Sequence, residues 1–173
     1  MVIGILSDSH GAVNRLDAAL ELFSRQGCQA LVHCGDIVSP DSLELLAEAD
    51  VPVHLCLGNM DRKSTAVLEA AKRLGFDAGW RTVEVSLDDD QHLLATHGDD
   101  EHLLAELIAG GMFPYLCHGH THRYRDERIG DVRVINPGAL WQPRDGSPPS
   151  VAVLDTATDR LQRLDLPGTP PPS

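Results

Sequence analysis

The chain has little positive charge and no long apolar run. Its formal net charge is −12 at pH 7, and only two of its 173 residues are lysines, Lys63 and Lys72. Proteins bind long nucleic acids through Lys and Arg side chains that neutralise phosphates, so we expect no such partner. No apolar run approaches the roughly 18 residues of a membrane-spanning helix, so we expect no membrane partner either.

The sequence also lacks the features of a secreted or zinc-finger protein. It enters an apolar strand-like run at once, with no basic segment or cleavage site before it. None of the four cysteines belongs to a Cys-x-x-Cys pair, and all lie in or beside apolar segments: Cys28, Cys34, Cys56 and Cys117. We therefore expect buried free thiols and a cytoplasmic location, and no closed structural zinc site.

Strand-like runs alternate with amphipathic helices in the first half of the chain. The predicted elements are, in order, strand Val2–Leu6, helix Asn14–Gln26, strand Ala30–Cys34, a helix that starts at Ser39-Pro40-Asp41, strand Val53–Leu57 and a helix from Ser64 to Gly75. The last helix should bury Val67, Leu68, Ala71 and Leu74. This βαβαβα order predicts a parallel sheet, and such sheets bind ligands at the C-terminal ends of their strands.

The second half is richer in strands. The predicted elements are a hairpin of Arg81–Leu87 with His92–Thr96, helix Glu101–Ile108, strand Tyr115–Cys117, a hairpin over Glu127–Ile135, and a hairpin of Val151–Leu154 with Leu161–Leu166. We expect two packed sheets flanked by helices in one domain, residues 1–166. Residues 167–173 are rich in proline and should form a loosely held tail.

Five polar motifs follow these strands, each with a glycine nearby. They are Asp8-Ser9-His10, Cys34-Gly35-Asp36, Gly58-Asn59-Met60-Asp61, Thr96-His97-Gly98-Asp99, and Cys117-His118-Gly119-His120-Thr121-His122. Alternate residues of an extended chain point the same way, and glycine lets the backbone approach one centre closely. The pattern is typical of a metal site at the end of a sheet.

The number of candidate ligands favours two metal ions. Seven side chains could bind metal: Asp8, His10, Asp36, Asn59, His97, His120 and His122. If Asp36 bridges, each ion has four protein ligands and keeps open positions. Mixed imidazole, carboxylate and amide ligands suit manganese, iron, zinc or nickel better than calcium or magnesium, and manganese is our first choice. Two such ions acidify a bridging water to hydroxide, which can attack phosphorus in line with the leaving oxygen.

In order and spacing, these motifs resemble those of the calcineurin-like metallophosphoesterases, whose pattern is D-x-H, G-D, G-N-x-[DE], H and G-H-x-H. The resemblance spans residues 2 to 138 and implies an α/β/β/α sandwich of two mixed sheets flanked by helices. It implies one metal held by Asp8, His10, Asp36 and His122, and another held by Asp36, Asn59, His97 and His120. The small size and Asn136-Pro137-Gly138 look most like the short, single-domain phosphodiesterases of bacteria and archaea.

Two residues depart from the family pattern. Larger members carry a histidine after the asparagine, where it is thought to assist the leaving group, and this chain has Met60. A thioether cannot donate a proton, so a general acid is missing there. Short members often carry another histidine where this chain has Asp99, which alters the charge near His97.

We therefore expect a metal-dependent phosphodiesterase that acts on a small phosphoester, with Asp36, Asn59, His120 and His118 as the catalytic candidates. Phosphomonoesters are a second substrate class to test. Self-association into a homo-oligomer is compatible with the sequence. Two alternatives remain: a non-catalytic interaction scaffold on the same fold, as in the retromer subunit that resembles this family, and a protein phosphatase. Loss of ligands would favour the scaffold, and Met60 weakens the phosphatase.

Several motif neighbours have two open interpretations. His118 is either a supporting residue at a strand end or a group that contacts the phosphate or the leaving group. Asp61 either orients a neighbour of the site or caps the next helix. Asn136 either closes a tight turn with Pro137-Gly138 or binds phosphate or a supporting water at the site rim. The basic cluster of Arg123, Arg125 and Arg128 is either a solvated face or a rim that attracts an anion. The histidines outside the motifs, His33, His54, His92 and His102, are expected to be structural or solvated.

Overall fold

The computed structural model describes residues 1–63 and 65–167. Its helices are α1 (Val13–Arg25), α2 (Pro40–Ala47), α3 (Ala66–Arg73) and α4 (Glu101–Gly110), with short 3-10 turns η1 (Asp61–Lys63) and η2 (Asp88–Asp90). Its strands are β1 (Val2–Leu6), β2 (Ala30–His33), β3 (Val53–Cys56), β4 (Asp77–Gly79), β5 (Thr82–Ser86), β6 (His92–Thr96), β7 (Tyr115–Cys117), β8 (Tyr124–Ile129), β9 (Val132–Pro137), β10 (Ser150–Asp155) and β11 (Arg160–Asp165).

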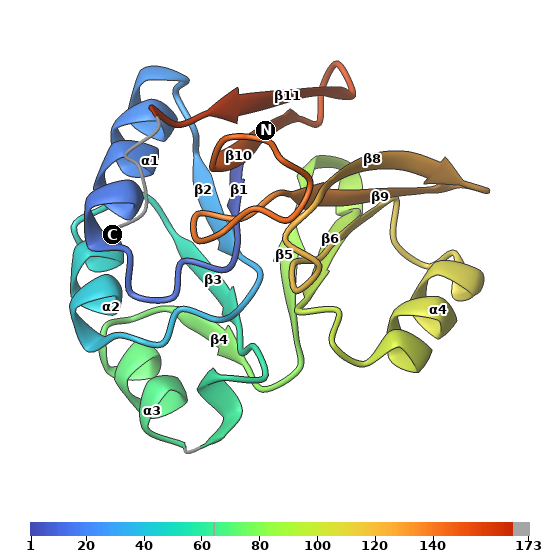
Figure 1. Cartoon of the computed structure of the whole chain (residues 1–173). Helices are drawn as coiled ribbons and strands as arrows, with labels where there is room; N and C mark the ends of the chain where they lie inside the picture. The colour runs from blue at the N-terminus through green and yellow to red at the C-terminus, as the bar shows by residue number, and fades with distance from the viewer. Residues whose placement is uncertain (64, 168–173) are drawn as a thin grey trace.

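These elements form a four-layer α/β/β/α sandwich, as expected (Figure 1). The first sheet has the strand order β11-β10-β1-β2-β3-β4 and the second has the order β5-β6-β7-β9-β8. Both sheets are mixed: β1 to β4 pair in parallel in the first, and β6, β7 and β9 pair in parallel in the second. Helices α1, α2 and α3 cover the outer face of the first sheet, and α4 lies outside the second.

Three apolar layers hold the sandwich together. The alternation along β1 shows how one strand serves two of them, because Ile3 and Ile5 pack between the sheets while Leu6 packs under the helices. Gly4 faces the helices too, and a Cβ atom there would lie 2.7 Å from the ring of Phe23. The third layer joins Leu94, Leu116, Val132 and Val134 of the second sheet to α4.

Most predicted elements are confirmed to within a few residues. Strand β4 was not predicted, because the segment Asp77–Gly79 is too short and too polar to be recognised as a strand from the sequence. The burial predicted for α3 is wrong at Leu74, which is 39% exposed because the helix ends at Arg73 and Leu74 is its C-cap. Ala71 is buried, while Val67 and Leu68 are half-buried against the core.

Other predictions about the chain have mixed outcomes. All four cysteines are buried free thiols, as predicted, and burial raises the pKa of Cys28 to about 11. Ser39 is the N-cap of α2, but its side chain makes no capping hydrogen bond. Ser64 and residues 168–173, most of the predicted tail, lie outside the described residues. Among the described helices, none is long and apolar enough to cross a membrane.

The apolar layer under the helices should carry much of the stability. Leu16 of α1 is completely buried there, so Leu16→Ala should lower the free energy of unfolding by about 2–5 kcal/mol. Leu74→Ala, at a half-solvated helix end, should change it by less than about 1 kcal/mol. Urea unfolding followed by circular dichroism measures both, and equal losses would contradict this assignment of the core.

Candidate active site

The five polar motifs converge at one end of the sandwich. Each lies in a loop after the C-terminal end of a strand: β1, β2 and β3 in the first sheet, and β6 and β7 in the second. Backbone hydrogen bonds join these loops, from Asp8 N to Gly35 O at 3.0 Å and from Gly119 N to His97 O at 3.0 Å. The two sheets therefore contribute to a single site.

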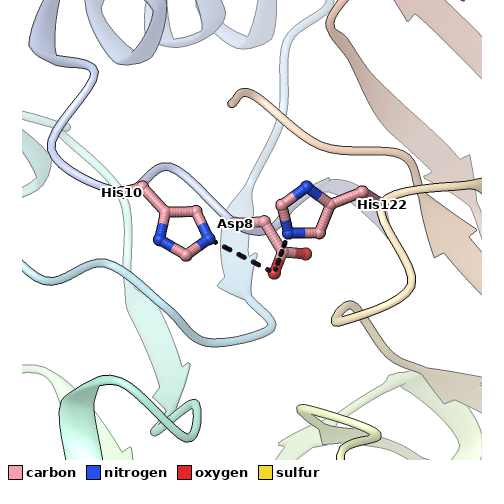
Figure 2. Close-up of side chains that lie close together, drawn as sticks. All are labelled: Asp8, His10 and His122. Atoms are coloured by element: carbon pink, nitrogen blue, oxygen red, sulfur yellow. Dashed lines mark ion pairs between the residues drawn. The ribbon is translucent and has the colours of Figure 1, made fainter. Parts of the chain in front are cut away.

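Asp8, His10 and His122 form the first group of possible metal ligands (Figure 2). The Asp8 Oδ1 atom lies 3.3 Å from His122 Nε2 and 3.9 Å from His10 Nε2. Asp36 is adjacent, with its Oδ2 atom 3.7 Å from His10 Nε2. One donor atom from each member of the group lies within 4.8 Å of the others, which is close enough for one ion.

Asp8, Asp36 and His97 form a second group. The Asp36 Oδ2 atom lies 3.5 Å from His97 Nε2, and the three residues have donor atoms within 4.8 Å of one another. Asn59 Oδ1 is 3.1 Å from the same nitrogen of His97. The His120 ring lies beside the His97 ring, with their centroids 5.1 Å apart. Both groups share Asp8, and the Asp36 Oδ2 atom contacts one histidine of each, His10 and His97.

Two of the candidate donor atoms have no hydrogen-bond partner among the described residues, as expected of atoms that bind a metal ion. They are Asp8 Oδ1 and His10 Nε2, and both are buried. Buried polar atoms are rarely left in this state unless something else satisfies them. His97 and His122 donate from Nδ1 to the carbonyl oxygens of Cys34 and Gln142, at 2.8 and 2.9 Å. These hydrogen bonds direct Nε2 toward the site, as is usual for metal-binding histidines.

The backbone is strained where the candidate ligands lie. Five of the seven have positive φ values, although none is glycine: Asp8 (53°), His10 (44°), Asp36 (57°), His120 (64°) and His122 (56°). Non-glycine residues seldom adopt this conformation, and such residues cluster at functional sites.

Two glycines explain how the loops approach so closely. A Cβ atom on Gly58 would lie 2.0 Å from Asp36 Oδ1, and one on Gly119 would lie 1.8 Å from the Ser7 hydroxyl oxygen. Neither position can accept a side chain without moving the site. The glycines that accompany the sequence motifs therefore have a steric reason.

The charges of the site support one another. Burial alone would raise the pKa of Asp36, but contact with His97 and the backbone N–H of Met60 keep it below its usual value. Burial likewise works against Asp8, yet His122 and His97 keep the pKa of that carboxyl group low. Both carboxylates are therefore negative at neutral pH, as cation binding requires. Burial lowers the pKa of His10 and of His120, which favours the neutral imidazole that binds metal.

Asp61 is buried beside the site and positions two of its loops. Its carboxylate accepts hydrogen bonds from the backbone N–H groups of Ile37 (3.2 Å), Val38 (2.8 Å) and Gly58 (3.0 Å). These bonds tie the loop after β2 to the loop after β3. Of the two open interpretations, the structure supports orientation of neighbours rather than capping of α3.

His33 is a supporting residue that the sequence motifs did not include. It is completely buried, accepts a hydrogen bond at Nδ1 from Gly35 N (3.2 Å), and donates from Nε2 to Ser9 Oγ (3.0 Å). Burial lowers its pKa to about 4, so it is neutral at physiological pH. It links the first two ligand loops. Its position directly before Cys34-Gly35-Asp36 is the feature of the sequence that could have identified it as a supporting residue.

His118 and Asn136 lie together beneath the histidine-rich loop. The Asn136 amide nitrogen donates to Gly119 O (2.9 Å) and Thr121 Oγ1 (3.1 Å), and its oxygen accepts from Gly138 N (3.0 Å). Asn136 thus closes the turn and also holds the loop. His118 is buried with its Nδ1 3.2 Å from Gly119 O, and burial lowers its pKa to about 4. Its catalytic role stays a prediction.

The remaining predicted residues lie at the edge or outside. Met60 is 37% exposed, and Asp99 forms an ion pair with Arg62. In the basic cluster, Arg125 pairs with Glu127 and Arg128 with Asp159, while Arg123 is exposed. Outside the motifs, His54 contacts Asp77 and the exposed His102 contacts Glu106.

Comparisons with known proteins identify the family of the chain. The sequence model of the calcineurin-like phosphoesterase superfamily domain matches residues 1–159. A phosphodiesterase of Methanocaldococcus jannaschii is 30% identical over 96% of this chain and 99% of its own length. The phosphodiesterase YfcE of Escherichia coli is 30% identical over 90% of this chain and 88% of its own length.

Solved structures show the same likeness. The structure of an archaeal phosphodiesterase superposes with a TM-score of 0.85 and 29% identity, covering 96% of this chain and all of that one. A Vps29 structure from Entamoeba histolytica has a TM-score of 0.66 at 18% identity, covering 96% of this chain and all of that one, which shows a shared fold alone.

The close approach at Gly58 can be tested directly. Gly58→Ala should displace the Asp36 carboxylate and weaken Mn²⁺ binding by about 10–100-fold, the usual effect of disturbing the support of a metal ligand. Gly110→Ala is the matched control, because a Cβ atom there meets nothing within 4 Å. Calorimetric titration of both variants measures the effect. Unchanged affinity in Gly58→Ala would show that Asp36 is not held as described.

Proposed function

The chain belongs to the calcineurin-like phosphoesterase superfamily and is a phosphoric ester hydrolase, and on that premise we propose that it hydrolyses small phosphodiesters with two divalent metal ions. One observation carries the proposal. The Asp36 Oδ2 atom lies 3.7 Å from His10 Nε2 and 3.5 Å from His97 Nε2, so one oxygen contacts a histidine of each proposed ligand set.

We assign each ion four ligands that share Asp36. Asp8, His10 and His122 complete one set, and Asn59, His97 and His120 complete the other. Both sets combine imidazole nitrogen with carboxylate or amide oxygen, a mixture that suits manganese, iron, zinc or nickel. When bound, two such ions supply Lewis-acid activation of the phosphoryl oxygens and of the attacking water.

The side chains of the site position the metal ligands and provide negative charge for the two ions. Asp36 gives negative charge to both positions, and Asp61 holds its loop through the N–H groups of Ile37 and Val38. His120 and His122 both have strained backbones; the His120 ring lies beside that of His97, and the His122 ring lies beside Asp8. Met60 stands beside Asn59 and offers no proton, so the leaving oxygen departs with little help from that position. His118, at the base of the same loop, remains our candidate for contact with the phosphate or the leaving group.

The alternative functions have less support. A non-catalytic scaffold needs no complete ligand set, whereas all seven candidate ligands are present here and converge. The shared fold with Vps29 carries no function to this chain at 18% identity. A protein phosphatase would need a proton donor where this chain has Met60, and a thioether cannot donate a proton. It would also need a large surface to recognise a protein substrate, which a chain of 173 residues has little room for. The buried thiols support a reducing compartment, the cytoplasm.

The shared role of Asp36 gives the first functional prediction. Wild-type protein should bind two equivalents of Mn²⁺ and hydrolyse bis(4-nitrophenyl) phosphate, whereas Asp36→Asn should lose at least about 100-fold in rate, the scale of losing a major electrostatic group. The metal content of both proteins is measured alongside the rate. Asp41→Asn, which removes the same charge from the exposed first turn of α2, is the control and should keep full activity.

Two results would count against this proposal. If wild-type protein saturates at one equivalent of metal, the two-ion site is wrong. If it binds two ions but hydrolyses no phosphoester, the scaffold becomes the better account.

The absence of an acid at Met60 gives a second prediction. The rate should depend steeply on the pKa of the leaving group, so bis(4-nitrophenyl) phosphate should react far faster than a dialkyl ester of similar size. Positioned general acids contribute about 10²–10⁴-fold, so Met60→His should narrow the gap visibly if its ring reaches the leaving oxygen. A series of aryl esters measures the slope. A flat slope in wild-type protein would mean that another group, such as His118, already donates the proton.

A further inference from the structure

The loop after β9 borders the candidate metal site although none of its residues belongs to the five motifs. We call residues Trp141–Arg144 the rim loop. Trp141 N donates to Asp8 O at 2.9 Å, and Arg144 N donates to His122 O at 2.9 Å. Between them, Gln142 O accepts the hydrogen bond from His122 Nδ1 at 2.9 Å. Four consecutive residues thus make three contacts with two candidate ligands.

The backbone of the rim loop is fixed in an unusual conformation. Gln142 has a φ of 46°, which is rare for a residue with a side chain, and Pro143 follows it with a restricted φ. Gln142 is exposed, so packing of its side chain does not account for the strain. Two residues further on, the backbone of Arg144 contacts His122, and its side chain reaches the carbonyl oxygen of His120.

Arg144 is exposed, and its guanidinium group has N–H donors available for a further partner. Its Nη1 atom lies 3.5 Å from the carbonyl oxygen of His120, and no carboxylate forms an ion pair with it in residues 1–63 and 65–167. Other arginines near the site are engaged: Arg62 pairs with Asp99, and Arg15 donates to Leu140 O at 2.7 Å. Arg144 is therefore well placed to take a new anionic partner beside the metal ligands.

We propose that Arg144 is a substrate-binding residue whose guanidinium group holds a non-bridging oxygen of the phosphoryl group. A guanidinium presents a planar fork of N–H donors that matches phosphate geometry, and it stays charged at any physiological pH. The chain carries a net charge of −12, so an anionic ester approaches against a repulsive surface. A cation at the rim offsets this locally. The inference rests on the proposed function, because it assigns a residue to the same site.

Binding of inorganic phosphate tests the assignment without requiring turnover. Calorimetric titration of Mn²⁺-loaded protein should show that Arg144→Gln lowers phosphate affinity by about 10- to 100-fold, as expected for a lost hydrogen bond between charged groups. Arg144→Lys should retain part of it. Arg123→Gln removes the same charge from an exposed arginine next to His122 and should cost less than about 3-fold. Arg160→Gln, on β11, is a second control.

A kinetic arm separates binding from mere support of the loop. Arg144→Gln should keep two metal ions per chain and show the same loss in kcat/KM for bis(4-nitrophenyl) phosphate. Guanidinium ions added to Arg144→Ala should restore part of the phosphate affinity, because they can occupy the vacated space.

Three results would overturn the inference. Unchanged phosphate affinity in Arg144→Gln would show that Arg144 does not contact the phosphate. Equal losses of affinity in Arg144→Gln and Arg123→Gln would show that Arg144 acts only through its general positive charge. Loss of metal in Arg144→Gln would make the residue a support of His120. If wild-type protein takes up no metal, the proposed function fails, and the same titrations on the protein as isolated decide the role of Arg144 independently.

Discussion

The contact between Asp36 and His97 is the interaction on which the site depends, because it joins the two sheets. Asp36 follows β2 in the first sheet and His97 follows β6 in the second, and their side chains meet at 3.5 Å. The hydrogen bond from His97 to Cys34 O repeats the link one step closer to the core. Below it, the apolar layer between the sheets sets their spacing. A site assembled from both sheets therefore keeps its geometry only while that layer is packed.

The site is arranged at a cost to stability. Five candidate ligands have strained backbones, and Asp8 Oδ1 and His10 Nε2 are buried without a hydrogen-bond partner in the part of the chain that the structure describes. Each strained residue costs about 1–3 kcal/mol. The buried supports compensate in part: Asp61 accepts three backbone N–H groups, and Asn136 joins the histidine-rich loop to the turn at Gly138. Bound cations would satisfy the remaining atoms.

The sequence predicted the fold and the convergence well, for physical reasons. Parallel strands place their C-terminal ends at one edge, so polar residues after β1, β2 and β3 had to lie near one another. What it missed depends on tertiary packing. His33 looks like any histidine in an apolar strand, and only the fold shows that it links Gly35 to Ser9. The rim loop carries no metal-ligand pattern, and Leu74 falls at a helix end that periodicity does not locate.

The most direct test of the account is the position of the metal ions. Anomalous diffraction from crystals grown with Mn²⁺ would locate them without assumptions about activity. We predict two peaks roughly 3.5–4 Å apart with the Asp36 carboxylate between them, the spacing usual for two-metal phosphoesterases. A single peak, or two peaks that do not share Asp36, would contradict the central claim that this carboxylate unites two sites.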